Sequence, residues 1–122
     1  MIGQRIRRVE SLLVREVSEI LIREIKDPRV KGVTITGAKV SPDLHHAVIY
    51  YHSHAADADL KVAESGLESI RGKVKKIIGK RIRMKFLPDI RFCYDDSLEY
   101  ADHIESLLKQ ALPGSGEEGI NK

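Results

Sequence analysis

The 122-residue chain has no tryptophan, only two phenylalanines and a single cysteine, Cys93. One cysteine cannot form an internal disulfide or a multi-cysteine zinc site. Because it lies in the middle of a predicted strand, we expect it to be a small buried side chain rather than a nucleophile. No apolar run reaches the length of a membrane span, and the basic N-terminus is not followed by the apolar stretch of a signal peptide. These absences favour a cytoplasmic protein with no membrane partner.

The chain also lacks the glycine-rich loops that bind phosphate. It has neither a P-loop nor a dinucleotide-binding fingerprint. KH domains hold a nucleic-acid backbone with a GxxG loop, but the one match to that pattern, Gly116–Gly119, contains Glu117 and Glu118. These two carboxylates would repel phosphate, so the match is excluded from the candidate site.

Catalytic and metal sites are not predicted either. Zinc requires three or four convergent ligands, and the histidines at positions 45, 46, 52 and 54 have no such spacing with carboxylates or thiolates. The candidate acids Asp89, Asp95 and Asp96 stand where turns and helix caps are expected. The sequence therefore predicts a protein that is not an enzyme, with no catalytic residues, no metal and no cofactor.

Positive charge is concentrated in the segment Arg71–Arg91. It holds nine basic residues and one acid, a net charge of +8, whereas the whole chain carries +3. Apolar residues are interleaved with the basic ones, so one side can pack on a core while the other faces solvent. A solvated helix face is the simpler alternative, but its acidic i,i+4 partners are missing. The segment therefore favours binding to a polyanion, and it forms a positive pole with the basic N-terminus if the two meet in space.

Apolar residues at helical spacing predict a first helix, Arg5–Lys26, which Pro28 ends. The first strand of a hairpin follows, and its apolar positions change parity after Gly37. One extra residue at a glycine is typical of a β-bulge, so we expect a bulge at or beside this residue. A turn at Ser41–Asp43 then leads to a second strand, His46–His52.

A second helical pattern covers Asp59–Gly79. Gly72 lies in its middle, where glycine weakens a helix by about 1 kcal/mol, and predicts a bend that divides the pattern into two helices. A third strand, Ile90–Tyr94, follows, and the apolar positions between Leu98 and Leu108 predict a last helix.

Together these patterns predict one α+β domain over residues 4–110, in the order α-β-β-α-kink-α-β-α. A three-stranded sheet with helices packed on one face would bury its apolar positions. Residues 111–122 have little to bury and are predicted to be a disordered C-terminal tail.

Three fragments carry a resemblance to a known family. Its most specific parts are Ile25-Lys26-Asp27-Pro28-Arg29 at the end of the first helix, Ser41-Pro42-Asp43-Leu44 at the hairpin, and Leu87-Pro88-Asp89-Ile90 followed by Phe92, Tyr94, Asp95 and Ser97. Over Gln4–Leu108 the chain closely resembles bacterial ribosome-binding factor A. The resemblance implies a type II KH-like fold in which an interhelical kink, Ala-x-Gly, replaces the GxxG loop. The matching positions are Ile70, Arg71 and Gly72, so the glycine is kept and isoleucine stands where the family has alanine.

The resemblance further implies a factor that binds the small ribosomal subunit late in its assembly and assists the maturation of its ribosomal RNA, notably in the cold, without being a nuclease. The expected partners are the small subunit and its RNA, with assembly GTPases as further candidates, and the protein is expected to be a monomer. The candidate RNA-binding residues are Arg5, Arg7, Arg8, Arg29, Arg71, Gly72, Lys73, Lys75, Lys76, Lys80, Arg81, Arg83 and Lys85. Two alternatives remain: a general KH-like regulator or chaperone that binds free nucleic acid, and a protein-interaction module that uses the acidic half of the chain.

Overall fold

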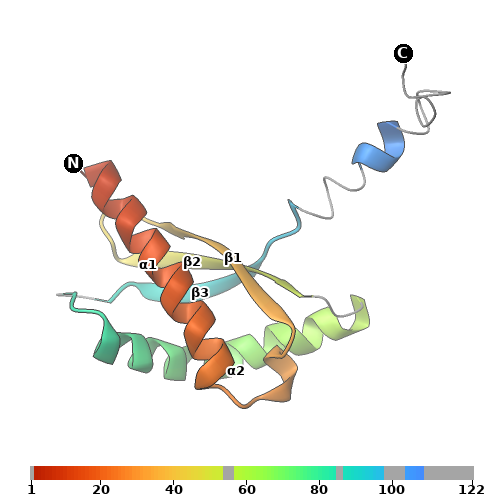
Figure 1. Cartoon of the computed structure of the whole chain (residues 1–122), viewed down its shortest axis with the longest axis horizontal. Helices are drawn as coiled ribbons and strands as arrows, with labels where there is room; N and C mark the ends of the chain where they lie inside the picture. The colour runs from red at the N-terminus through yellow and green to blue at the C-terminus, as the bar shows by residue number, and fades with distance from the viewer. Residues whose placement is uncertain (1, 54–56, 85–86, 98–103, 109–122) are drawn as a thin grey trace.

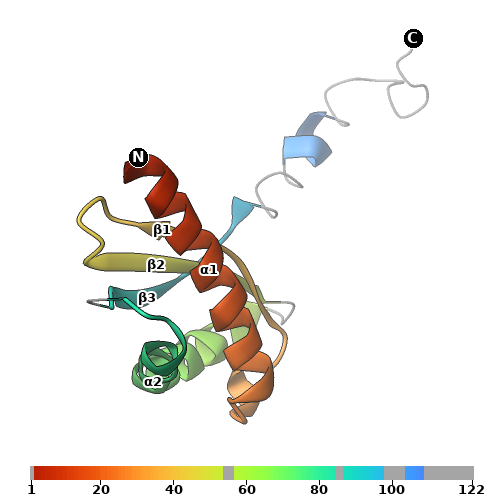
Figure 2. The same ribbon diagram turned by 60° about the vertical axis from the view of Figure 1, so that its left-hand side comes forward.

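The computed structural model describes residues 2–53, 57–84, 87–97 and 104–108. Its elements, in chain order, are the helix α1 (Ile2–Arg23), the 3-10 turn η1 (Pro28–Val30), the strands β1 (Val33–Val40) and β2 (His46–Ser53), the helix α2 (Asp57–Arg81) and the strand β3 (Asp89–Tyr94). The sheet order is β1-β2-β3, with β1 antiparallel and β3 parallel to β2. α1 crosses β1 and α2 runs along β3 (Figures 1 and 2). The predicted α+β class and three-stranded sheet are confirmed.

Both helices pack on the same face of the sheet. Along β2 the buried positions alternate with exposed or half-buried ones, which is the period of a strand covered on one side only. The buried residues of β2 are Ala47, Ile49, Tyr51 and Ser53. The helices contribute Leu13, Val17, Ile20, Val74 and Ile78, none of which has any exposed surface. The core therefore lies between the sheet and the two helices.

α1 ends at Arg23, three residues before the predicted end at Lys26. Beyond the helix, Ile25 is still buried, so the connection to β1 packs on the core. Asp27 has the extended backbone (φ −72°, ψ 117°) that a following proline favours. Its carboxylate accepts a hydrogen bond from the backbone N–H of Arg29 at 2.9 Å, and this bond caps η1.

The predicted bulge in β1 is confirmed. Ile35 and Gly37 pair with consecutive residues of β2, Tyr51 and Tyr50, which leaves Thr36 as the extra residue. The side-chain period of a strand is two, so one inserted residue restores the apolar side chains to the same face. Apolar positions on both sides of the bulge consequently face the core.

The predicted division of the second helical pattern is wrong, because α2 is one continuous helix through Gly72. A Cβ atom built at this glycine would meet nothing within 4 Å, and its φ is not positive, so no neighbour requires a glycine there. The buried face keeps one helical phase on both sides of it, through Ala63, Leu67, Ile70, Val74 and Ile78. Continuous packing of that face offsets the roughly 1 kcal/mol by which glycine weakens a helix.

The close approach in α2 occurs instead at Gly66. A Cβ atom there would lie 2.7 Å from the Cβ of Arg29 and 3.1 Å from the Cγ1 of Val30. In the same place, the Arg29 guanidinium donates a hydrogen bond to the Ser69 hydroxyl at 2.9 Å. The missing side chain therefore allows η1 to lie directly against α2.

No helix among the described residues covers the opposite face of the sheet. Cys93 and Tyr50 are neighbours in the β2–β3 register on this face. Cys93 is exposed, so the expectation that it is a buried side chain is wrong. Its strand neighbours explain this, because Ile90 and Phe92 take the inward positions of β3 and side chains alternate along a strand.

Residues 104–108 are helical, as predicted for the last helix, but their side chains are exposed. This described part of the helix therefore does not cover the sheet, contrary to expectation. The preceding residues 98–103 and the predicted tail, 111–122, lie outside the described residues. Within the described ranges, no helix is long and apolar enough to cross a membrane.

Candidate nucleic-acid interface

α1 and α2 meet where Arg81, at the C-terminal end of α2, contacts Glu16, Glu19 and Glu24 of α1, whereas the N-terminal end of α1 extends away from α2 (Figure 1). Between the two helices lies a groove of about 440 Å³, which we call the α1/α2 groove. Its lining residues are Arg5, Val9, Leu12, Arg15, Glu16, Arg81, Ile82, Arg83 and Met84. The arginines are exposed, whereas the apolar residues are buried or half-buried. The groove therefore has an apolar floor and a rim of four arginines with a single carboxylate.

Arg81, a predicted phosphate ligand, is held by carboxylates of α1. Its Nη1 lies 2.7 Å from Glu19 and 3.2 Å from Glu16, and its Nη2 lies 3.3 Å from Glu24. The hydrogen bond to Glu16 is the largest cause that raises the pKa of Arg81 above its ordinary value, followed by that to Glu19. The guanidinium thus fixes the C-terminal end of α2 against α1, and it borders the α1/α2 groove with its charge largely compensated.

Arg29 and Arg71 are also engaged within the fold. The Arg29 guanidinium pairs with Asp27 at 2.7 Å. The side-chain hydrogen bond between them is the first cause that lowers the pKa of Asp27 and raises that of Arg29. Arg71 pairs with Glu68 at 3.0 Å and donates a hydrogen bond to the carbonyl of Ile90 at 3.2 Å. Both arginines therefore join elements of the fold, α2 to η1 and α2 to β3.

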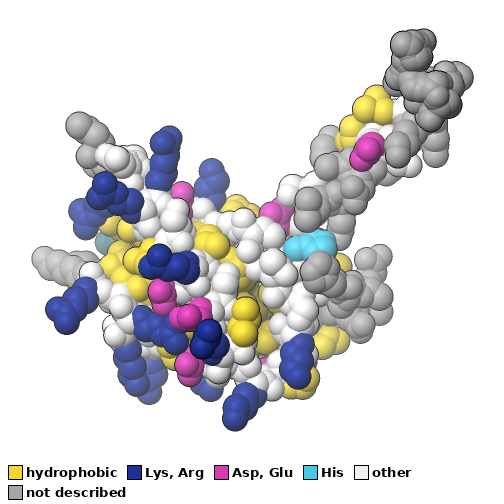
Figure 3. Space-filling view, in the orientation of Figure 1, with side chains coloured by type: hydrophobic (Ala, Val, Ile, Leu, Met, Phe, Trp, Pro, Cys, Tyr) yellow, Lys and Arg dark blue, Asp and Glu magenta, His cyan; other side chains and the backbone are white. Residues whose placement is uncertain are grey.

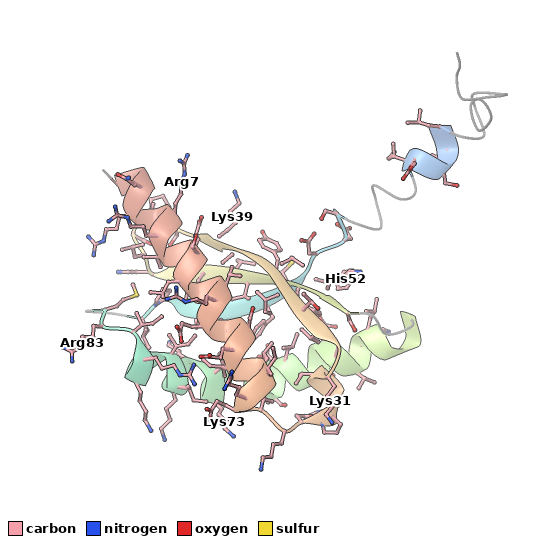
Figure 4. All side chains as sticks on the ribbon, in the orientation of Figure 1. Arg7, Lys31, Lys39, His52, Lys73 and Arg83 are labelled. Carbon is pink, nitrogen blue, oxygen red and sulfur yellow. The ribbon has the colours of Figure 1, made fainter. Side chains whose placement is uncertain are left out.

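The other predicted cations are free of such partners. Within the described part of the chain, seven of the predicted RNA-binding cations are exposed and form neither an ion pair nor a side-chain hydrogen bond: Arg5, Arg7, Arg8, Lys73, Lys76, Lys80 and Arg83. Figure 3 shows Lys and Arg side chains along the edges of this view, with Asp and Glu side chains gathered between them over α1. In Figure 4, Arg7 lies at the N-terminal end of α1, Lys73 extends from α2 and Arg83 lies beyond the end of α2. The free cations thus come from both helices and from the segment that follows α2.

The remaining predicted residues have different surroundings. Lys75 is half-buried and lines a separate hollow with His45, Leu87 and Asp89. Gly72 is exposed on α2 and has no close neighbour. Lys85 lies outside the described residues.

Sequence reasoning missed Arg15, which borders the α1/α2 groove. It also borders a second hollow on α1, shared with Arg7 and Arg8, so the cationic surface continues from the groove across α1. A signal was present, because Arg5, Leu12 and Glu16 recur at helical spacing and define one side of α1. The spacing in the sequence could not show that the C-terminal end of α2 lies opposite this side of α1.

No group of three or more histidine, cysteine, aspartate or glutamate side chains in the described ranges could hold a metal ion. Of the histidines considered from the sequence, His52 stacks on Tyr94 with ring centroids 5.6 Å apart. His45 lies 3.9 Å from a carboxylate oxygen of Asp43. These two histidines thus contact an aromatic ring and a carboxylate, respectively.

The arrangement of elements is similar to that of solved structures. The crystal structure of ribosome-binding factor A from Thermus thermophilus matches with a TM-score of 0.64 at 22% identity, covering 73% of this chain and 94% of that one. A homology model of Thermus thermophilus ribosome-binding factor A, fitted into the cryo-EM map of a 30S complex of that protein, matches with a TM-score of 0.60 at 22% identity, covering 71% and 91%. The fold is thus that of a small α+β domain of the type II KH-like class.

Sequence comparison gives the family. The family model described as ribosome-binding factor A matches residues 5–108. A ribosome-binding factor A from Citrifermentans bemidjiense is 42% identical over 109 residues, which cover 89% of this chain and 86% of that protein. The chain belongs to the ribosome-binding factor A family.

Proposed function

We propose that the protein binds the small ribosomal subunit in the cytoplasm and assists the late folding and processing of its ribosomal RNA without catalysing a reaction. The family relationship supports this function, and a structurally similar protein has been fitted into the map of a 30S complex. The observation that carries the proposal is the set of free cations on α1, on α2 and just beyond the end of α2. In the described residues, the cations of this set have no internal partner that a phosphate would have to displace.

Binding alone can assist RNA folding. A protein that binds one RNA conformer better than another shifts the population towards it. Lys73, Lys76 and Lys80 lie at helical spacing on the exposed side of α2, opposite its buried face. Such cations contact phosphates and set the position of the protein, while they recognise little base sequence. The protein is therefore expected to recognise the shape of structured RNA through its backbone.

The proposal is tested by cosedimentation with purified small subunits over a range of salt concentrations. If about five phosphates are contacted, log K should fall against log salt with a slope of about −3.5 to −4.5, because each contact releases condensed counterions. The variant Lys73→Glu/Lys76→Glu/Lys80→Glu should bind far more weakly and with a shallower slope. Circular dichroism should show unchanged helicity, since all three side chains face solvent.

A matched control changes the charge equally at a different place. Lys31→Glu/Lys39→Glu/Lys61→Glu alters three exposed lysines outside the C-terminal half of α2, and Figure 4 shows Lys31 and Lys39 far from Arg83. Equal loss in both variants would mean that net charge alone determines binding. Wild-type affinity in the folded α2 variant would exclude that surface. Tight binding to short free oligonucleotides but not to subunits would favour the general regulator instead.

A further inference from the structure

The α1/α2 groove combines two kinds of lining that a simple anion site does not need. Its rim carries Arg5, Arg15 and Arg83 as exposed guanidinium groups, and Arg81 is already held by carboxylates. Its floor is formed by the apolar side chains Val9, Leu12, Ile82 and Met84. Guanidinium groups suit phosphate oxygens because they can offer two parallel N–H donors. An apolar floor, by contrast, suits the sugar and base that are attached to a phosphate.

We infer that the α1/α2 groove binds one nucleotide unit of an RNA strand, with its phosphate at the arginine rim and its sugar and base on the apolar floor. The volume of about 440 Å³ falls within the roughly 300–1,000 Å³ of sites that enclose small organic groups. Arginine side chains can also stack on a base. This inference deepens the proposed function and rests on it.

Charge around the groove favours RNA over an acidic peptide. The cationic surface leaves the groove across α1, where Arg15 is shared with a hollow bordered by Arg7 and Arg8. On the other side, the exposed face of α2 carries Lys76 and Lys80. An RNA strand carries one phosphate per nucleotide, so its backbone would contact cations before, inside and after the groove. A single acidic side chain of a peptide would need only the cations inside the groove.

Arg81 is a positioning residue in this arrangement. Its three ion pairs with Glu16, Glu19 and Glu24 join α2 to α1, and these two helices form the walls of the groove. Glu16 is only 18% exposed and is shared between Arg81 and Arg15, whose Nε lies 3.7 Å away. The carboxylate is therefore neutralised by two arginines, so that it does not oppose a phosphate at the rim.

The first arm of the test compares two double variants of the full chain. Arg15→Ala/Arg83→Ala removes two rim charges, and Lys31→Ala/Lys61→Ala removes two exposed charges elsewhere. The rim variant should bind small subunits roughly a hundredfold more weakly, about tenfold for each charged contact, and with a salt slope shallower by about 1.4–1.8. The control should stay within a few fold of the wild type. Equal losses in the two folded variants would overturn the inference while leaving the proposed function intact.

The second arm identifies what occupies the groove and does not depend on affinity. The photo-crosslinking amino acid p-benzoylphenylalanine is introduced in place of Met84, at the groove, or in place of Val62, an exposed residue in the N-terminal half of α2. Irradiation of complexes with subunits should join position 84, but not position 62, to ribosomal RNA. A crosslink from position 84 to a ribosomal protein, or yields no higher than at position 62, would refute the nucleotide site. If the unmodified protein fails to bind subunits at all, the proposed function fails with it.

Discussion

Two glycines of α2 allow the same substitution to be made in opposite surroundings. Gly72→Ala places a methyl group in open space, since nothing lies within 4 Å of the position that its Cβ would take. Gly66→Ala places one 2.7 Å from the Cβ of Arg29 and 3.1 Å from the Cγ1 of Val30. Neither glycine has a positive φ, so alanine is compatible with the backbone at both positions.

The expected free energies of unfolding follow from two opposing terms. Alanine favours the helix over glycine by about 1 kcal/mol at both positions. At Gly72 that gain is unopposed, so the variant should be about 1 kcal/mol more stable than the wild type. At Gly66 the contacted atoms are a Cβ beside the backbone and a β-branched methyl group, which cannot swing away. Overpacking costs roughly 1–3 kcal/mol, so this variant should be destabilised by up to about 2 kcal/mol.

Thermal and urea denaturation of the two variants and the wild type measure this difference. At a domain size near 100 residues, 1 kcal/mol shifts Tm by roughly 4–8 °C, so the two alanine variants, separated by about 1–3 kcal/mol, should differ in Tm by at least about 4 °C. Gly72→Ala should also bind subunits as the wild type does, because α2 is already continuous there. If Gly66→Ala is as stable as Gly72→Ala, the close packing of η1 on α2 is refuted; if Gly72→Ala is destabilised, a kink exists in solution after all.

Three further outcomes are expected. Arg81→Ala should lower Tm. The difference in Tm between this variant and the wild type should narrow at high salt, because screening weakens ion pairs. A difference in Tm that does not depend on salt would contradict the ionic role of Arg81. Asp95 has its pKa lowered from 3.8 to about 2, first of all by the hydrogen bond from Thr36. A depressed carboxyl pKa contributes stability that is present above 3.8 and lost as the pH falls through about 2. In Thr36→Val the pKa, followed by NMR titration, should therefore rise, and the stability gap to the wild type should close at low pH; an unchanged pKa would contradict the assignment. Glu10 accepts a hydrogen bond from the backbone N–H of Val40 at 2.9 Å. Glu10→Ala should therefore lower the free energy of unfolding by about 1 kcal/mol, whereas Glu10→Gln keeps an acceptor and should lose less. Equal stability of the two variants in urea would refute this role of Glu10.

Most of the fold could be predicted because it follows from local rules. Side-chain parity around Gly37 located the bulge, since one inserted residue shifts every later side chain to the other face. Asp27 and Pro28 marked the end of the first helical region, because proline restricts the residue before it. The prediction of a kink at Gly72 was wrong because it rested on local propensity without tertiary packing. Gly72 lowers helix propensity locally, but the helix is held by core packing on both sides of that residue, and propensity alone does not report packing.

The candidate site was only partly predictable. Charge density located the basic segment, yet charge carries no information about partners far away in the sequence. Arg81 looks like its neighbours Lys80 and Arg83 in the sequence, and only the fold brings Glu16 and Glu19 of α1 to it. For the same reason Arg15 was overlooked, because its importance depends on which helix lies opposite. Separating structural arginines from available ones required knowledge of the tertiary contacts.

The parallel pairing of β2 with β3 has a consequence for how the protein is made. Ile90 is fully buried and pairs with Ala47, although α2 separates them in the chain. During synthesis from the N-terminus, α1 and the β1–β2 hairpin can form from local contacts, while this strand is still absent. Until β3 arrives, one side of β2 is an unpaired strand edge, which is a surface prone to wrong pairing. A nascent chain that stops before Tyr94 is therefore an incomplete sheet and a target for aggregation, rather than a smaller version of the domain.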